Sequence, residues 1–425
     1  MGFIDFLSKV FGNKASRDLK AIQPLVEEVK RLYPQIQALS NDELRARTQQ
    51  IMQDLQDAVK ADRDKIQHLK DTVEDLEVEK REAVWAEVDK LKKQGMKQAI
   101  IDLSDNGGGY LNAAIDMCNE FLDRGQLIVY TEGNTAPRDE ATAKGNGKYK
   151  DMRLVVITNQ YSASAAEIFS GAMQDWDRAV VVGRRSFGKG LVQRPFEFED
   201  GSMMRLTVAR YYTPSGRCIQ KPYKKGDKKA YDLDLLDRAK EGEYYSLDSI
   251  HFNDTLRYAT LKNNRPIYGG GGIMPDIFVP VDTTEYSTYY RDMVAKGIVN
   301  QYVVDFVDKN RNRIKKDFKS VKDYDARFEV SDEQMKDFIA MGEKDGVKFD
   351  EEKYNVSKNV LRLMIKALIA RDVFSDSSAY TVVINKRNKD LEAALSVIND
   401  DQRFNDLLLH GNTDYERLVV KNSSK

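Results

Sequence analysis

The residues best suited to chemistry are one serine and one lysine, each within a stretch of small side chains. Ser164 lies in YSASAAEIFSGA (161–172), and Lys189 lies in GRRSFGKGLVQ (183–193). Each stretch follows a short apolar run that is typical of a strand, so both residues are expected at turns. A hydroxyl between alanines can be approached closely by a substrate, and a lysine at a glycine turn can serve as its base. The pair therefore predicts nucleophilic hydrolysis without histidine.

Both residues have competing interpretations. Serine is a common helix N-cap, and Ser162 competes with Ser164 for either role. The stretch around Lys189 nearly matches the phosphate-binding pattern GxxxxGK[ST], but position 190 is glycine and the following LVQRPFEFE alternates like a strand. These two departures argue against nucleotide binding. A lysine base must also be uncharged near neutral pH, which requires burial or nearby positive charge.

A third element, DNGGG (105–109), follows the strand-like KQAIIDL (97–103). Three glycines permit backbone conformations that other residues avoid. One interpretation is a simple strand-to-helix turn. The other is that a backbone N–H of Gly108 or Gly109 faces a reacting carbonyl group, and that N–H groups at the start of the helix after Ser164 do the same.

Composition limits the other classes of function. The chain has 425 residues, enough for two or three domains, and its formal net charge of −1 gives no overall field that attracts nucleic acid. The only cysteines are Cys118 and Cys218, which impose no disulfide framework, and Cys118 is expected in the core. None of the three histidines neighbours Cys, Asp or Glu at the spacing of metal ligands. No metal site is therefore predicted.

The first 95 residues are expected to be helical. Ser40 and Glu43 form a capping-box signature. The apolar residues Ile66, Leu69, Val73 and Leu76 follow a step of three and four before the register is lost, which favours a helical hairpin. Residues 1–14 form an amphipathic helix pattern, interpreted either as a helix docked on the rest of the protein or as one lying on a membrane surface.

From residue 96 to about 283, strand and helix patterns alternate, which predicts an α/β layer with a largely parallel sheet. Residues 221–268 interrupt this pattern as a charged, tyrosine-rich surface insertion. Residues 284–411 are expected to be helical, with 361–374 as a packed core helix, and 412–425 are expected to be a frayed tail.

Several motifs together resemble the carboxyl-terminal processing proteases, from about residue 92 to about 411. The matching stretches, in order, are DLSDNGGGYL (102–111), SASAAE (162–167), FGKG (187–190), DGSMMRLTVARYYTPSGR (200–217) and GGIMPD (271–276). Ser104 stands where this family usually has arginine. The resemblance implies a ClpP/crotonase-like core that lacks its first strands, and a Ser/Lys dyad that needs no metal or cofactor.

By the same resemblance, Ser164 is the nucleophile, Lys189 is the general base, and Gln193 orients the lysine. Backbone N–H groups of Gly108 or Gly109 and of Ala165 would form the oxyanion hole. The implied activity is that of a serine-type endopeptidase that cleaves protein substrates near their carboxyl ends through an acyl-enzyme.

Residues 1–93 instead resemble the amino-terminal leader of the SecA preprotein-translocase ATPase. The resemblance ends before a phosphate-binding loop, so it implies no motor function. Two alternatives to an active peptidase follow: a catalytically inactive fusion without a PDZ domain and the first core strands, and a module that docks on a membrane or translocase. The protease family implies a location outside the cytoplasmic membrane, whereas the amino terminus has no export signal.

Overall fold

The structure is a computed structural model that describes residues 14–51, 53–54, 57, 82, 84–198, 200–223, 226–375, 377–412, 414–415 and 419–420. It divides into two units: Met1–Gly95 together with Glu197–Met203, and Met96–Phe196 together with Met204–Lys425. The amphipathic pattern at residues 1–14, interpreted as a helix docked on the protein or lying on a membrane, is outside the residues whose side chains are described. The apolar residues Ile66, Leu69, Val73 and Leu76 are also outside them.

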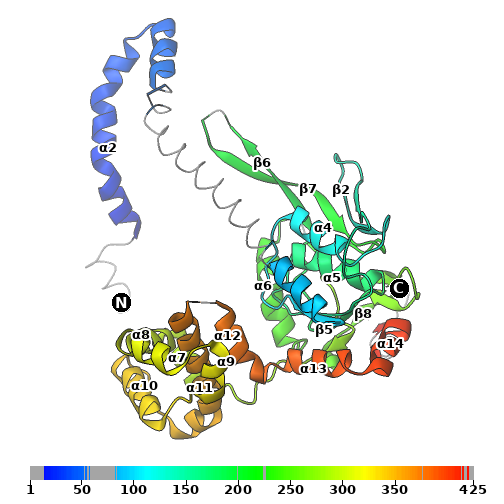
Figure 1. The fold of residues 1–425 in the computed structure, drawn as a ribbon. Coiled ribbons are helices and arrows are strands. Elements are labelled where there is room, and N and C mark those ends of the chain that lie inside the picture. The colour runs from blue at the N-terminus through cyan, green and yellow to red at the C-terminus, as the bar shows by residue number, and fades with distance from the viewer. Residues whose placement is uncertain are drawn as a thin grey trace. The chain divides into compact units, whose positions relative to one another are not determined.

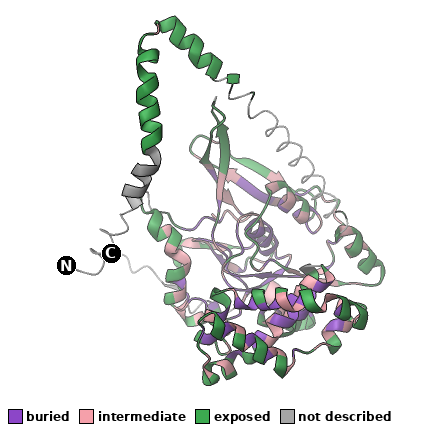
Figure 2. Ribbon diagram, turned by 90° about the vertical axis from the view of Figure 1, so that its left-hand side faces the viewer, coloured by how far each residue is buried: buried purple, intermediate pink, exposed green. Residues whose placement is uncertain are grey.

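Residues 14–95 of the first unit are mostly helical where they are described. Helix α2 spans Lys14–Gln37, and Ser40 begins the next helix. The predicted capping box is confirmed, since the backbone N–H of Ser40 donates to Glu43 Oε2 at 2.9 Å. Figure 2 shows these helices largely in the colour of exposed residues. No described helix is long and apolar enough to cross a membrane.

The second unit contains the predicted parallel sheet (Figure 1). It has the order β1-β4-β5-β11, with β1 at Gln98–Asp102, β4 at Arg153–Thr158, β5 at Val180–Gly183 and β11 at Ile277–Phe278. All three pairs of neighbours run parallel. Strands β4 and β5 are almost wholly buried, because a parallel sheet is covered on both faces.

A second sheet departs from the expectation of one parallel layer. Its order is β3-β2-β7-β6, with β2 at Leu127–Glu132, β3 at Asp139–Thr142, β6 at Leu191–Glu197 and β7 at Met203–Tyr212. Strand β2 pairs antiparallel with both β3 and β7. The reason is that β3 arises within the polar loop after β2, and antiparallel strands need only a short connection.

Helices cover the parallel sheet. Helices α4 (Leu111–Asn119) and α5 (Ala165–Asp175) pack on each other, and α13 (Lys389–Ile398) and α14 (Asp401–His410) pack on strand residues such as Val155 and Val182. The predicted burial of Cys118 in α4 is confirmed. Helix α5 is buried along nearly its whole length, so the turn that precedes it is held from one side by the core.

The insertion and the tail are more ordered than their sequences indicate. The insertion contains α6 (Lys228–Lys240), β8 (Phe252–Asn253), β9 (Arg257–Ala259) and β10 (Pro266–Tyr268), with short 3-10 turns at Leu247–Ser249 and Asp254–Leu256. The expectation of a frayed tail is wrong at Tyr415, which is buried and donates to Pro275 O at 2.8 Å. Strand β12 (Val419–Val420) pairs with β8.

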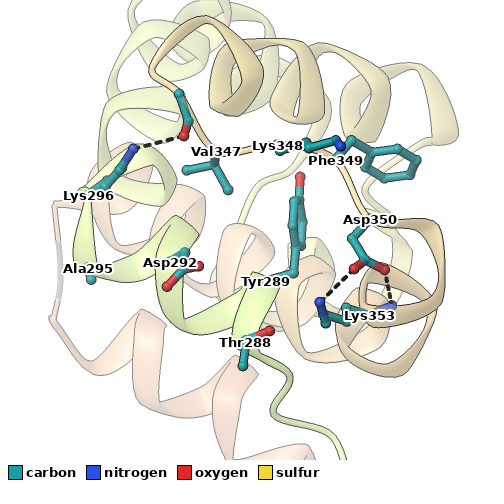
Figure 3. Close-up of a pocket in the computed structure, with 11 residues that line it drawn as sticks. Thr288, Tyr289, Asp292, Ala295, Lys296, Val347, Lys348, Phe349, Asp350 and Lys353 are labelled. Carbon is teal, nitrogen blue, oxygen red and sulfur yellow. Dashed lines mark hydrogen bonds and ion pairs between the residues drawn. The ribbon is translucent and has the colours of Figure 1, made fainter.

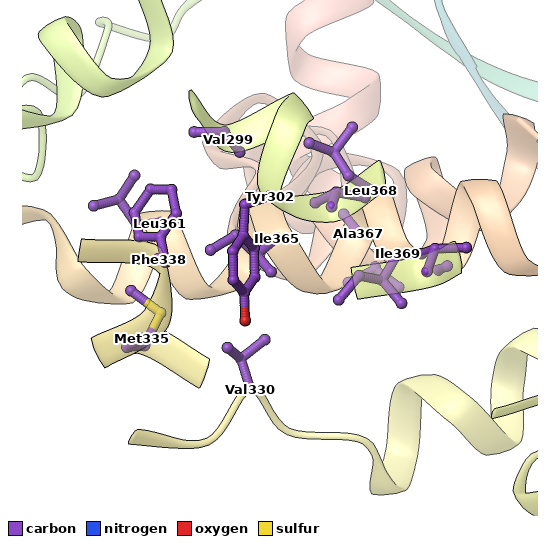
Figure 4. Packing of buried hydrophobic residues seen from close by; sticks show 14 of the residues in the cluster. Val299, Tyr302, Val330, Met335, Phe338, Leu361, Ile365, Ala367, Leu368 and Ile369 are labelled. Carbon is purple, nitrogen blue, oxygen red and sulfur yellow. The ribbon is translucent and has the colours of Figure 1, made fainter. Parts of the chain in front are cut away.

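The carboxyl-terminal helical region has its own core (Figure 4). Its helices are α7 (Thr288–Ala295), α8 (Ile298–Asp317), α9 (Val321–Arg327), α10 (Asp332–Lys344), α11 (Glu351–Phe374) and α12 (Ser377–Ile384). The prediction of a packed core helix at 361–374 is confirmed, because Leu361, Ile365 and Ile369 of α11 are fully buried.

Candidate active site

Ser164 lies at a strained turn between β4 and α5. Its backbone has φ 56° and ψ −114°, a region that residues other than glycine rarely adopt. The side chain is partly exposed, and the residue is the N-cap of α5. Such strain persists only where the surrounding structure enforces it, and it is common at functional sites.

The competition between the two serines is resolved by burial. Ser162 is 0 % exposed, donates from Oγ to Leu103 O at 2.7 Å and accepts from the backbone N–H of Asn159 at 2.9 Å. Its hydroxyl therefore joins the ends of β1 and β4. Ser164 is the serine that remains accessible to a substrate.

The glycine loop lies directly against Ser164. A Cβ atom placed on Gly108 would lie 2.7 Å from both Ala163 O and Ser164 Cβ, and 2.9 Å from Ala165 N. Gly108 also has φ +98°, so glycine is required here for two reasons. A Cβ on Gly109 would meet nothing within 4 Å. The loop and the start of α5 thus converge on one spot.

The backbone donors of this spot are not equivalent. The N–H of Gly108 donates to Asn106 Oδ1 at 2.9 Å, so it is occupied within its own loop. Within the described part of the chain, the N–H groups of Gly109 and Ala165 donate to no protein acceptor. Ala165 is the first residue of α5, where the N–H has no partner inside the helix.

Lys189 reaches the site through its backbone. Its N–H donates to Glu167 Oε2 at 2.8 Å, and the N–H of Ser164 donates to the same oxygen at 2.8 Å. The Lys189 side chain is exposed, as is that of Gln193 on β6. Among the described residues, no hydrogen bond joins Lys189 Nζ to Ser164 Oγ. The two turns are held together by the main chain, and the two side chains are not engaged with each other.

Glu167 is the residue that the sequence interpretation missed. It is 0 % exposed, yet its carboxylate accepts four hydrogen bonds. The donors are Ser186 Oγ at 2.6 Å, Gly188 N at 2.6 Å, Lys189 N at 2.8 Å and Ser164 N at 2.8 Å. Burial raises the pKa of Glu167 above its ordinary value, and the four hydrogen bonds oppose this rise.

The ionised form is the one that this geometry favours. Three of the four donors are backbone N–H groups, which cannot accept a proton from a carboxylic acid. The fourth, the Ser186 hydroxyl, already accepts from the N–H of Ile273 at 2.6 Å, so it donates to Glu167. A signal for this role was present: Ser164 and Glu167 have the same Ser-x-x-Glu spacing as Ser40 and Glu43.

Other features of the second unit do not belong to this site. A pocket in the carboxyl-terminal helical region is lined by residues of α7, the 346–350 loop and Lys353 (Figure 3), none of which is a predicted site residue. Within the described residues, no group of three or more His, Cys, Asp or Glu side chains is placed to hold a metal ion.

Two family models match this chain. Residues 69–229 match peptidase family S41, and residues 289–375 match a family of unknown function, DUF8443. The match to peptidase family S41 begins earlier than the boundary expected near residue 92. Neither model covers residues 1–68, so the resemblance to the SecA leader stays a prediction.

Relatives named "Probable CtpA-like serine protease" match part of the chain. The protein from Staphylococcus epidermidis is 41% identical over 131 residues, which cover 31% of this chain and 27% of that protein. The protein from Staphylococcus saprophyticus is 36% identical over 169 residues, which cover 40% of this chain and 33% of that protein. The chain thus spans a third or less of the length of these curated relatives.

A solved structure gives a similar partial match. The photosystem II D1 C-terminal processing protease shares 39% identity, with coverage of 31% of this chain and 34% of that chain and a TM-score of 0.30.

The contact of Gly108 with the Ser164 turn predicts the effect of adding one methyl group. Gly108→Ala should lower the rate at which Ser164 reacts with a serine-directed probe by roughly tenfold or more, because the new Cβ must displace Ala163 or Ser164. Gly107→Ala is the matched control, because a Cβ there would meet nothing within 4 Å, and it should react at nearly the wild-type rate. Equal rates for the two variants would show that the glycine loop does not shape the site.

The four hydrogen bonds of Glu167 predict a cost for its amide analogue. Glu167→Gln replaces one acceptor oxygen by an NH₂ group that faces N–H donors, so the free energy of unfolding should fall by about 2 kcal/mol or more. Chemical denaturation followed by circular dichroism measures this change, with the exposed Glu132→Gln as control. A loss no larger than that of the control would contradict the bridging role.

Proposed function

We propose that this chain is a serine-type endopeptidase in which Ser164 is the nucleophile and Lys189 is the general base. The observation that carries the proposal is the convergence of three elements: the strained Ser164 turn, the Gly108 loop and the Lys189 turn, joined through Glu167. The match of residues 69–229 to peptidase family S41 supports the same class of reaction. A ClpP/crotonase-like core is part of this proposal.

In the proposed reaction, Ser164 Oγ attacks the carbonyl carbon of a peptide bond while Lys189 Nζ accepts the hydroxyl proton. Negative charge develops on the carbonyl oxygen, where the N–H groups of Ala165 and Gly109 would stabilise it. The tetrahedral intermediate expels the amine, which takes the proton from Lys189, and an acyl-enzyme remains. Water, deprotonated by the same lysine, then releases the acid and restores Ser164.

The position of Lys189 sets a condition for this mechanism. A lysine base must be uncharged when it accepts the proton, which requires burial or nearby positive charge, and the Lys189 side chain is exposed. A bound protein substrate would supply the missing burial, because its chain would cover the amine and exclude water from it. The proposed substrates are therefore protein segments, and a cut near their carboxyl ends is part of the proposal because the family resemblance implies it.

One observation favours the second candidate, a catalytically inactive chain. The side chains of Lys189 and Gln193 are both exposed, and among the described residues no side-chain hydrogen bond joins Lys189 to Ser164. In an inactive chain, the Glu167 network would serve only to hold the fold.

Proteolysis of an unfolded protein separates the two candidates. The purified full chain should cleave unfolded casein, and both Ser164→Ala and Lys189→Ala should lower the rate by at least about 10³-fold, because each removes a group needed for acyl transfer. Lys228→Ala removes another exposed lysine and should cleave at the wild-type rate. No cleavage by the unaltered chain, or equal cleavage by the Ser164 variant, would establish the inactive alternative.

A further inference from the structure

The turn 185–189 is held from outside the peptidase core as well as from within it. On the inner side, the N–H groups of Gly188 and Lys189 donate to Glu167. On the outer side, the carbonyl oxygens of Arg185 and Ser186 need donors of their own, because an ionised carboxylate such as Glu167 only accepts hydrogen bonds. Buried carbonyl groups are rarely left without a partner, since an unmade hydrogen bond is costly.

Arg238 of the insertion supplies both donors. It lies in the last turn of α6 and is 5 % exposed. Its Nη2 donates to Arg185 O at 2.9 Å, and its Nη1 donates to Ser186 O at 3.2 Å. The planar guanidinium group can serve both oxygens at once, which a single ammonium group does poorly.

Glu243 completes the arrangement. Its Oε1 accepts from Arg238 Nη2 at 2.7 Å, and its Oε2 accepts from Arg185 Nη2 at 2.6 Å. The carboxylate therefore ties the insertion to the side chain of the turn, while Arg238 ties it to the backbone of the same turn. Both residues are buried, so each charged side chain needs the opposite charge of the other to offset the cost of leaving water.

We infer that Arg238 and Glu243 make the insertion a positioning element for Lys189. The inner clamp, Glu167, fixes the turn to the Ser164 turn, and the outer clamp, Arg238 with Glu243, fixes it to α6. Release of the outer clamp would free the Arg185 and Ser186 carbonyls and let the turn move. The insertion thus determines where the turn places Lys189. The catalytic part of this inference rests on the proposed function.

Hydrogen exchange of the full chain tests the clamp without requiring any activity. In Arg238→Gln, exchange in residues 184–190 should accelerate by roughly tenfold or more, the effect of one lost buried hydrogen bond, while exchange in β4 stays unchanged. Glu243→Gln removes only the charge and should show a smaller change in the same residues. Arg257→Gln, an exposed arginine of the same insertion, is the matched control and should exchange as the unaltered chain does.

Casein cleavage by the same variants gives the second readout. Arg238→Gln should lower kcat with little change in KM, and Arg238→Lys should recover part of kcat because it keeps the charge partner of Glu243. If exchange accelerates at 184–190 but the unaltered chain does not cleave casein, the Arg238–Glu243 clamp is supported and the proposed peptidase function is contradicted. Unchanged exchange at 184–190 in both Arg238→Gln and Glu243→Gln would overturn the clamp, whether or not the chain cleaves casein.

Discussion

A buried carboxylate that accepts four hydrogen bonds is the constraint on which the candidate site depends. Glu167 binds the N–H groups of Ser164, Gly188 and Lys189 and the hydroxyl of Ser186. These donors belong to two turns that are more than twenty residues apart in sequence. Because a buried carboxylate without donors is very unfavourable, folding brings both turns to it, and each turn then restricts the other.

Much of the site follows from sequence because local signals were strong. Short apolar runs predicted β1, β4 and β5, and parallel strands bring their carboxyl ends to one edge of a sheet. For this reason the loop after β1 and the turn after β4 lie together, as the contact of Gly108 with Ser164 shows. The strand that follows Lys189 also matches the pattern that argued against a nucleotide-binding loop.

Other parts required information that is not local. The sequence of QLIVYT indicates a strand, but it does not say which sheet receives it, and pairing with β7 is a contact across about eighty residues. Helix α6 has a weak apolar pattern, and its only buried residue is Arg238. No apolar face in its sequence therefore indicates where the helix packs. Tyr415 is buried, and its hydroxyl donates to Pro275 O, a residue 140 positions earlier. No pattern in the sequence near the tail indicates this contact. The exposure of the Lys189 side chain likewise depends on which distant segments pack beside it, and the sequence around Lys189 does not contain this information.

Buried ion pairs extend the same principle through the second unit. Arg217 pairs with Asp175, and Arg265 pairs with both Asp177 and Asp276. These pairs join the end of α5 to Arg217 before the insertion and to Arg265 near the end of the insertion, which also pairs with Asp276 beyond it. Arg184, just after β5, pairs with Asp390 at the start of α13. The Lys189 turn thus begins beside one buried pair and is followed by an insertion that is anchored by others, which explains how a mostly polar segment holds a defined position.

The central claim is that Ser164 is an activated nucleophile within this assembly of turns. The most direct measurement is mass spectrometry of the purified full chain after treatment with a fluorophosphonate, followed by peptide mapping. The account predicts a single adduct on Ser164 that heat denaturation abolishes. An adduct on Ser162 or another serine, or no adduct on the folded chain, would contradict it.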